Sequence, residues 1–134
     1  MRIAQFNVEN LFLYLDKYKG ENIDKLTESQ WQSLSSSNTD LKSLAKTSQI
    51  ASIINDIGAE IYVLNEVGGK ESLSVFCTHF LHDNYTPHLI EGNSDRGIDV
   101  GYIVKATSEY NYDLKTNKDR QLSGTYYNLS LIHI

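Results

Sequence analysis

A helix pattern that leads directly into a continuous apolar segment is the feature that most constrains the fold of this chain. Gly58 supplies a left-handed stop after the helix pattern, and residues 61–64 are all apolar or aromatic. Such a run is typical of an inner strand covered on both faces of a sheet. The helix pattern consists of isoleucines with the spacing i, i+3, i+4 and i+7, namely Ile50, Ile53, Ile54 and Ile57. Together these features predict a helix joined by a short turn to a buried strand.

The other segments extend this alternation of helices and strands. Residues 3–8 predict a short buried strand, and residues 28–34 predict a short helix that the single tryptophan, Trp31, anchors by burial. The surrounding stretch 18–38 is otherwise polar, and the sequence assigns it no role. The remaining patterns predict a helix over 70–81 and strands over 85–90 and 98–104. This order favours the α/β class with a mixed sheet.

The charge balance limits the partners that the sequence predicts. The chain has 134 residues, of which 40% are hydrophobic, and a formal net charge of -5 at pH 7. Its length fits one globular domain or part of a larger one. The acidic balance argues against a broad basic surface that binds nucleic acid by counterion release alone. It is compatible with an enzyme that cleaves phosphate esters, because a bound metal ion supplies positive charge locally.

The compartment is predicted from what the sequence lacks. Cys77 is the only cysteine, which excludes a disulfide within the chain and a zinc site built from cysteines. The strand pattern begins at Ile3, and the charged leader followed by an apolar stretch that is typical of a signal peptide is not seen. No apolar run reaches membrane-spanning length. We therefore expect a cytoplasmic protein without membrane association, and the sequence indicates no obligate protein partner.

Oxygen-bearing side chains end two of the predicted strands. Asn7 lies at the end of the first strand, and Glu66 follows the apolar run. Ligands of open α/β sheets gather at the carboxyl ends of strands, and such side chains can hold a hard cation such as Mg²⁺. Glu66 would then be a metal ligand, and Asn7 would contact phosphate or metal-bound water. In the alternative interpretation Asn7 caps a turn and Glu66 is a solvated carboxylate; spacing alone favours this alternative.

A third polar cluster precedes the predicted strand 98–104. Arg96 could hold a phosphate through two parallel hydrogen bonds, with Asp95 or Asp99 orienting it. The alternative is a turn with a local ion pair that leads into the strand. His79 and His82 have a spacing that can bind metal, but without a third ligand nearby they favour an exposed helix face.

Taken in order, three blocks of the sequence resemble the endonuclease/exonuclease/phosphatase superfamily, which includes deoxyribonuclease I-like enzymes. Residues 2–12 resemble the opening strand with its asparagine, and residues 61–67 resemble the second strand with its metal-binding glutamate. Residues 95–103 resemble a block found in bacterial members. The likeness covers most of residues 1–104.

The resemblance implies a fold, a reaction and a set of site residues. The fold would be the N-terminal half of a four-layer α/β sandwich with mixed sheets. The reaction would be hydrolysis of phosphodiester bonds, in a nuclease, by in-line attack of water with Mg²⁺ as cofactor and Mn²⁺ as a substitute. Glu66 and Asn7 would be metal ligands and catalytic residues. Asn7, Arg96 and Asp99 would bind the substrate phosphate.

The sequence departs from the family pattern at two site positions. Asn65 stands before Glu66 where the family usually has glutamine, and a shorter amide alters how the glutamate is held. Arg96 stands where members that cut DNA at abasic sites usually carry tyrosine, which argues against that subgroup.

The later catalytic blocks of the family, Gly-Asp-x-Asn and Ser-Asp-His, do not occur in this sequence. The resemblance therefore implies that residues 1–128 are the N-terminal part of a single domain, which lacks the general base and is inactive alone. Two rival functions stay open. One is a phosphomonoesterase acting on a small metabolite or a lipid headgroup, and the other is a non-catalytic α/β binding module.

The last six residues have a coding signature of their own. Leu129–Ile134 can be encoded by CTG TCT CTT ATA CAC ATC, which is the mosaic end of a transposase used to fragment DNA before sequencing. This match predicts that residues 129–134 are an adapter-encoded artefact. The alternative is a coincidental apolar strand.

Reading the source DNA past the codon for Asn128 checks this interpretation. We expect the frame to continue into a Gly-Asp-x-Asn block and later a Ser-Asp-His block. Genomic DNA that encodes Leu129–Ile134 and then stops would show that the adapter interpretation is wrong and would favour the binding module.

Overall fold

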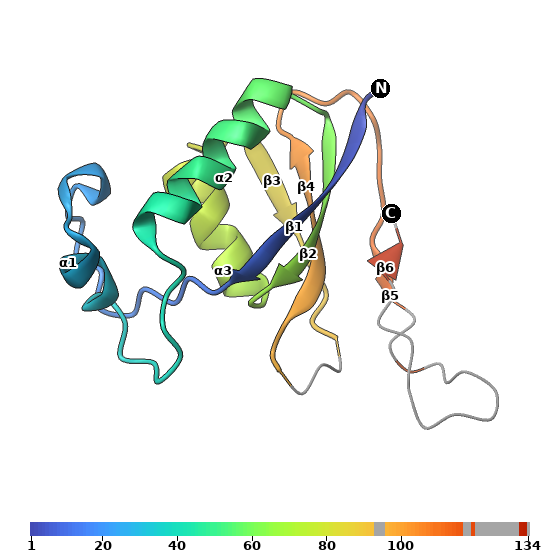
Figure 1. Ribbon diagram of the computed structural model, residues 1–134. Helices are drawn as coiled ribbons and strands as arrows, with labels where there is room; N and C mark the ends of the chain where they lie inside the picture. The colour runs from blue at the N-terminus through green and yellow to red at the C-terminus, as the bar shows by residue number, and fades with distance from the viewer. Residues whose placement is uncertain (93–95, 117–118, 120–131, 134) are drawn as a thin grey trace.

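A four-stranded mixed sheet with helices on one face forms the centre of the molecule (Figure 1). The computed structural model describes residues 1–92, 96–116, 119 and 132–133. The strands are β1 (Ile3–Leu11), β2 (Ile61–Val67), β3 (Tyr85–His88), β4 (Asp99–Lys105), β5 (Lys115–Thr116) and β6 (Ile132–His133). The helices are η1 (Ile23–Lys25), α1 (Glu28–Gln32), α2 (Leu44–Ile57), α3 (Lys70–Val75) and the π-helical turn η2 (Phe76–Phe80).

The sheet has the order β1-β2-β4-β3. β1 is parallel to β2, whereas β4 is antiparallel to both β2 and β3. The predicted mixed α/β class is therefore confirmed, and the apolar run at 61–64 lies in an inner strand, as expected. Because β1 and β2 are parallel, their carboxyl ends meet at the same end of the sheet, where ligand sites of α/β proteins form.

Helix α2 contains all four isoleucines of the predicted helix pattern and ends where the glycine predicts. The side chain of its N-cap, Ser43, accepts a hydrogen bond from the backbone N–H of Lys46. The carboxylate of Glu28, the first residue of α1, accepts from the N–H groups of Leu44 and Ala45 at 3.0 and 2.9 Å. Glu28 therefore caps the N-terminus of α2. Gly58 ends the helix with φ of 63°, a left-handed conformation that glycine adopts without strain.

The predicted apolar stripe of α2 is only half buried. Ile50 and Ile54 are 8% and 0% exposed, as expected of core residues. Ile53 and Ile57 are 41% and 43% exposed, so this half of the stripe faces away from the core. The reason is the position of β1 at the edge of the sheet: in the part of the chain that the structure describes, no element lies beyond β1 to cover them.

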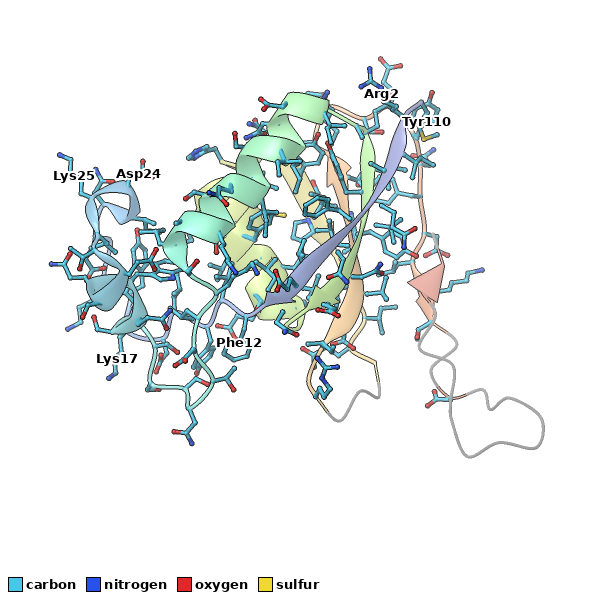
Figure 2. The ribbon with its side chains drawn as sticks, in the orientation of Figure 1. Arg2, Phe12, Lys17, Asp24, Lys25 and Tyr110 are labelled. Carbon is cyan, nitrogen blue, oxygen red and sulfur yellow. The ribbon has the colours of Figure 1, made fainter. Side chains whose placement is uncertain are left out.

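Residues 18–38 form a small lobe beside α2, in which Figure 2 labels Asp24 and Lys25. The lobe is anchored by Trp31, which is fully buried and packs edge-on against Phe80 at a ring distance of 5.7 Å. Its Nε1–H donates to the carbonyl of Lys42 at 2.8 Å. The predicted anchoring role of Trp31 is confirmed.

The two faces of the sheet are covered differently. Helices α2 and α3 cover one face and bury the main core, which contains Val8, Leu64 and Ile103. On the other face Ile61 and Tyr102 form a small cluster, onto which the chain after β4 packs. Among the described helices none has the length and apolar composition that crossing a membrane requires.

Two buried tyrosine hydroxyls tie the turn after α2 to the sheet. The Tyr62 hydroxyl donates to the carbonyl of Ile54 at 2.7 Å and accepts from the N–H of Ala59 at 3.1 Å. The Tyr85 hydroxyl donates to the carbonyl of Ala59 at 2.7 Å. Each buried polar group of this turn is thus paired, which is the condition for burying it without a large loss of stability.

Replacing Tyr62 by phenylalanine should lower the free energy of unfolding by about 1–3 kcal/mol, because it leaves the buried N–H of Ala59 without its partner and removes one of the two donors to the Ile54 carbonyl. Urea unfolding measures the loss. Tyr110→Phe is the matched control, because that ring is 50% exposed and the change should have little effect. Equal stability of the two variants would contradict the role given to the Tyr62 hydroxyl.

Candidate metal and phosphate site

The carboxyl ends of β1 and β2 share an irregularity that the sequence pattern does not show. The β1–β2 register shifts between Asn7 and Leu11, and the β2–β4 register shifts between Leu64 and Val67. Both strands therefore bulge near the point where they leave the sheet. Bulges of this kind are frequent next to active sites, where they re-aim side chains.

The bulges carry left-handed residues other than glycine. Glu9, Asn10 and Glu66 have φ of 52°, 55° and 62°. Such conformations cost about 1–3 kcal/mol each, and they cluster at ligand-binding and active sites. Strain of this kind on two adjacent strands indicates that the local geometry is needed for something other than stability.

The bulges decide which side chains leave the core. Val8 and Leu11 are both fully buried although they are separated by two residues, a spacing that regular strand alternation would place on opposite faces. The left-handed turn between them directs both intervening polar residues out of the core. β2 shows the same burial pattern, because Leu64 and Val67 are buried while the two residues between them, Asn65 and Glu66, are half-exposed.

Asn7 shapes the bulge of β1. Its Oδ1 accepts a hydrogen bond from the backbone N–H of Glu9 at 2.8 Å, which is the turn-capping role considered from the sequence. Its Nδ2 makes no hydrogen bond with any described residue and stays available as a donor. Asn7 also pairs in register with Asn65, so the two amides lie on neighbouring strands. A contact of Asn7 with phosphate or metal stays a prediction.

Lys42 holds the same bulge from outside the sheet. It lies just before α2, and its Nζ donates to the backbone carbonyl of Glu9 at 2.6 Å. Burial lowers the pKa of the Lys42 ammonium, and the carboxylates of Glu9 and Glu66 partly offset this by raising it. Lys42 therefore interacts electrostatically with both carboxylates without forming an ion pair with either. Sequence reasoning missed it, because no motif or spacing marks a lysine whose partner is a backbone carbonyl.

Arg96, from the third sequence block (residues 95–103), lies next to the bulge of β1. Its Nη2 lies 3.5 Å from Oδ1 of Asn10, a long contact that places the guanidinium beside the bulge of β1. Asp99 is 9% exposed, and its Oδ1 accepts from the N–H of Gly92 at 2.7 Å, which closes the connection between β3 and β4. Asp99 thus positions the segment that carries Arg96. Asp95, the other candidate partner of Arg96, lies outside the described residues.

Gly68 allows the exits of the two strands to approach closely. Its N–H donates to the carbonyl of Leu11 at 2.7 Å, and a Cβ at this position would meet the same oxygen at 2.7 Å. The Ser72 hydroxyl continues the contact, because it donates to the Gly68 carbonyl at 3.1 Å and accepts from the N–H of Leu13 at 2.9 Å. These bonds fix the carboxyl ends of β1 and β2 relative to each other.

The resulting site combines hard oxygen ligands with cations. In the described part of the chain, no three or more His, Cys, Asp or Glu side chains group closely enough to hold a metal ion. Mg²⁺ does not require such a group, because it usually binds one or two carboxylates together with waters and substrate phosphate oxygens. The half-exposed carboxylate of Glu66, directly after the Asn7–Asn65 register pair, fits this preference.

The described histidines lie elsewhere. The His79 ring packs edge-on against Tyr18 at 5.0 Å, and the His88 ring packs against Tyr112 at 4.8 Å. His82 is exposed after η2. None of them belongs to β1, β2 or the segment before β4.

No family model matches this chain, and neither a curated protein nor a solved structure is significantly similar to it. Its function is therefore inferred from the residues of the site.

Replacing Lys42 by methionine should destabilise the protein by about 1–2 kcal/mol, because the variant keeps the apolar stem but loses a charged donor to the Glu9 carbonyl. Thermal or urea unfolding measures the difference. Lys46→Met is the matched control, because the Lys46 ammonium makes no hydrogen bond with a described residue. If both variants are as stable as the wild type, Lys42 does not hold the bulge.

Proposed function

We propose that this chain carries the metal- and phosphate-binding part of a Mg²⁺-dependent phosphodiesterase that acts on nucleic acid. The paired bulges of β1 and β2 are the observation that carries this proposal. They put Glu66 directly after the Asn7–Asn65 register pair at the carboxyl end of the sheet, with left-handed backbone at Glu66 and at two residues of β1. The four-layer sandwich of deoxyribonuclease I-like enzymes is the architecture that we propose around this sheet.

The proposal gives each residue a separate role. Glu66 binds the metal ion directly through its carboxylate, and Asn7 assists through its side-chain amide. Mg²⁺, or Mn²⁺ as a substitute, supplies positive charge that stabilises the phosphate as charge develops on it. Arg96 binds a phosphate oxygen from the opposite side, and Asp99 holds the segment of Arg96 in place.

Lys42 has a role in the metal-free protein. The carboxylates of Glu9 and Glu66 both interact electrostatically with the Lys42 ammonium, whose positive charge partly compensates them. A bound cation would add to this compensation.

A non-catalytic binding module is the second candidate, because the proposed site does not include the base that hydrolysis needs. Hydrolysis by in-line attack requires a base that activates water. No described histidine lies at the bulges, so the proposal assigns this role to none of the described residues. Metal binding, rather than turnover, is therefore the primary measurement.

Glu66→Gln should weaken Mg²⁺ or Mn²⁺ binding by at least about tenfold, because it removes the charged ligand while keeping the shape of the side chain. Isothermal titration calorimetry of the full chain measures the affinity. Glu71→Gln is the control, because Glu71 is exposed on α3 and belongs to no strand end. Wild-type affinity in Glu66→Gln, or no cation binding by the wild type at millimolar concentration, would contradict the proposal.

A hydrolysis panel separates the candidate functions. Metal-dependent cutting of plasmid DNA that Glu66→Gln abolishes indicates the nuclease. Release of phosphate from monoesters with intact DNA indicates the phosphomonoesterase. Metal and phosphate binding without hydrolysis of any ester indicates the binding module.

A further inference from the structure

A groove between β1 and α2 adjoins the candidate site and is not used by the proposed chemistry. Its volume is about 230 Å³, and it begins at Asn7, Glu9 and Lys42, which also belong to the site. From there it continues along α2 past Lys46 to Ile53, with Phe6 of β1 on the facing side. A ligand in the groove would therefore be continuous with a phosphate bound at the strand ends.

Two lysines line the groove although the chain is acidic. Lys42 and Lys46 lie in its lining together with Glu9, and burial and the Lys46 ammonium both lower the pKa of Lys42. Neither ammonium forms an ion pair with a described carboxylate. Two adjacent cations in a chain of net charge -5 favour an anionic ligand.

Apolar side chains complete the lining. Phe6 of β1 faces Ile50 and Ile53 of α2, and Ile53 is 41% exposed. An inorganic anion would leave these side chains in contact with water. A ligand that contacts both the lysines and the apolar side chains must carry a negative charge and an apolar face a short distance apart, and a nucleotide has both.

We propose that this groove binds the nucleotide that adjoins the scissile phosphate of a nucleic-acid strand. Lys46 holds the phosphate of that nucleotide, and Phe6 and Ile53 contact the face of its base. The groove is smaller than the roughly 300–1,000 Å³ of pockets for drug-sized ligands, which suits a single nucleotide. The position next to the scissile phosphate rests on the proposed function, whereas binding of the nucleotide does not.

Binding of fluorescently labelled hexathymidylate to the full chain, followed by anisotropy at several salt concentrations, tests the proposal. Lys46→Ala should weaken binding about two- to fivefold, the loss expected for an exposed ion pair. The slope of log affinity against log salt should fall by about 0.7, as for one lost contact to a single-stranded phosphate. Lys25→Ala is the matched control, because Lys25 is exposed in the lobe away from the groove (Figure 2).

A competition experiment tests the apolar side chains of the groove separately. Ile53→Ser should weaken competition by thymidine monophosphate but not by inorganic phosphate, whereas Lys46→Ala should weaken both. If inorganic phosphate or polyglutamate competes as well as the mononucleotide in the wild type, the groove recognises charge only and the proposal is overturned. Equal affinities of Lys46→Ala and Lys25→Ala would overturn it as well.

The two proposals fail in different ways. Oligonucleotide binding that persists in EDTA and depends on Lys46, in a chain whose cation affinity is unchanged by Glu66→Gln, supports the groove and contradicts the metal site. Cation binding that depends on Glu66, in a chain whose oligonucleotide affinity is unchanged by Lys46→Ala, supports the metal site and contradicts the groove. Thermal unfolding of each variant shows whether it is folded. The substituted side chains of Lys46 and Ile53 both line the solvent-accessible groove.

Discussion

The geometry of the candidate site depends on the backbone contact between the exits of β1 and β2. The Gly68 N–H reaches the Leu11 carbonyl at a distance that leaves no room for a side chain at position 68. Both strands have to bulge before this contact, because each must return an apolar residue to the core after two polar ones. The same contact fixes where β1 passes into its loop and where β2 passes into α3. In Figure 2, Phe12 marks this point at the lower end of β1.

The site balances charge over a short range in a chain that is acidic as a whole. The carboxylates of Glu9 and Glu66 interact electrostatically with the ammonium of Lys42, and the guanidinium of Arg96 lies beside Asn10. Anionic and cationic groups thus alternate around the ends of two strands. A surface of this kind can accept a divalent cation and a phosphate together, since each compensates the charge that the other leaves. Net charge taken from composition is a poor guide to such a surface.

The sequence was sufficient for the fold class because burial has a simple periodicity. The apolar run at 61–64 identified the inner strand, and Gly58 marked the end of α2. The half-exposed stripe of α2 was not predictable, because helix periodicity does not reveal that the helix lies next to an edge strand. Of the site, Asn7 and Glu66 were identified from strand ends. The bulges were not, because a left-handed φ at glutamate or asparagine leaves no mark in the residue pattern. Lys42 was missed for a related reason, since its partner is a main-chain oxygen.

The anchoring of the small lobe has an optical consequence. Trp31 is the only tryptophan of the chain, and its indole N–H is bonded to the carbonyl of Lys42, the residue whose ammonium meets the bulge of β1. The emission of an indole responds to its hydrogen bond and to charges around it. The chain therefore contains a single tryptophan fluorophore, and one residue connects it to the strand ends. A cation or phosphate arriving there changes the charge around Lys42, so the site carries its own spectroscopic reporter without any label.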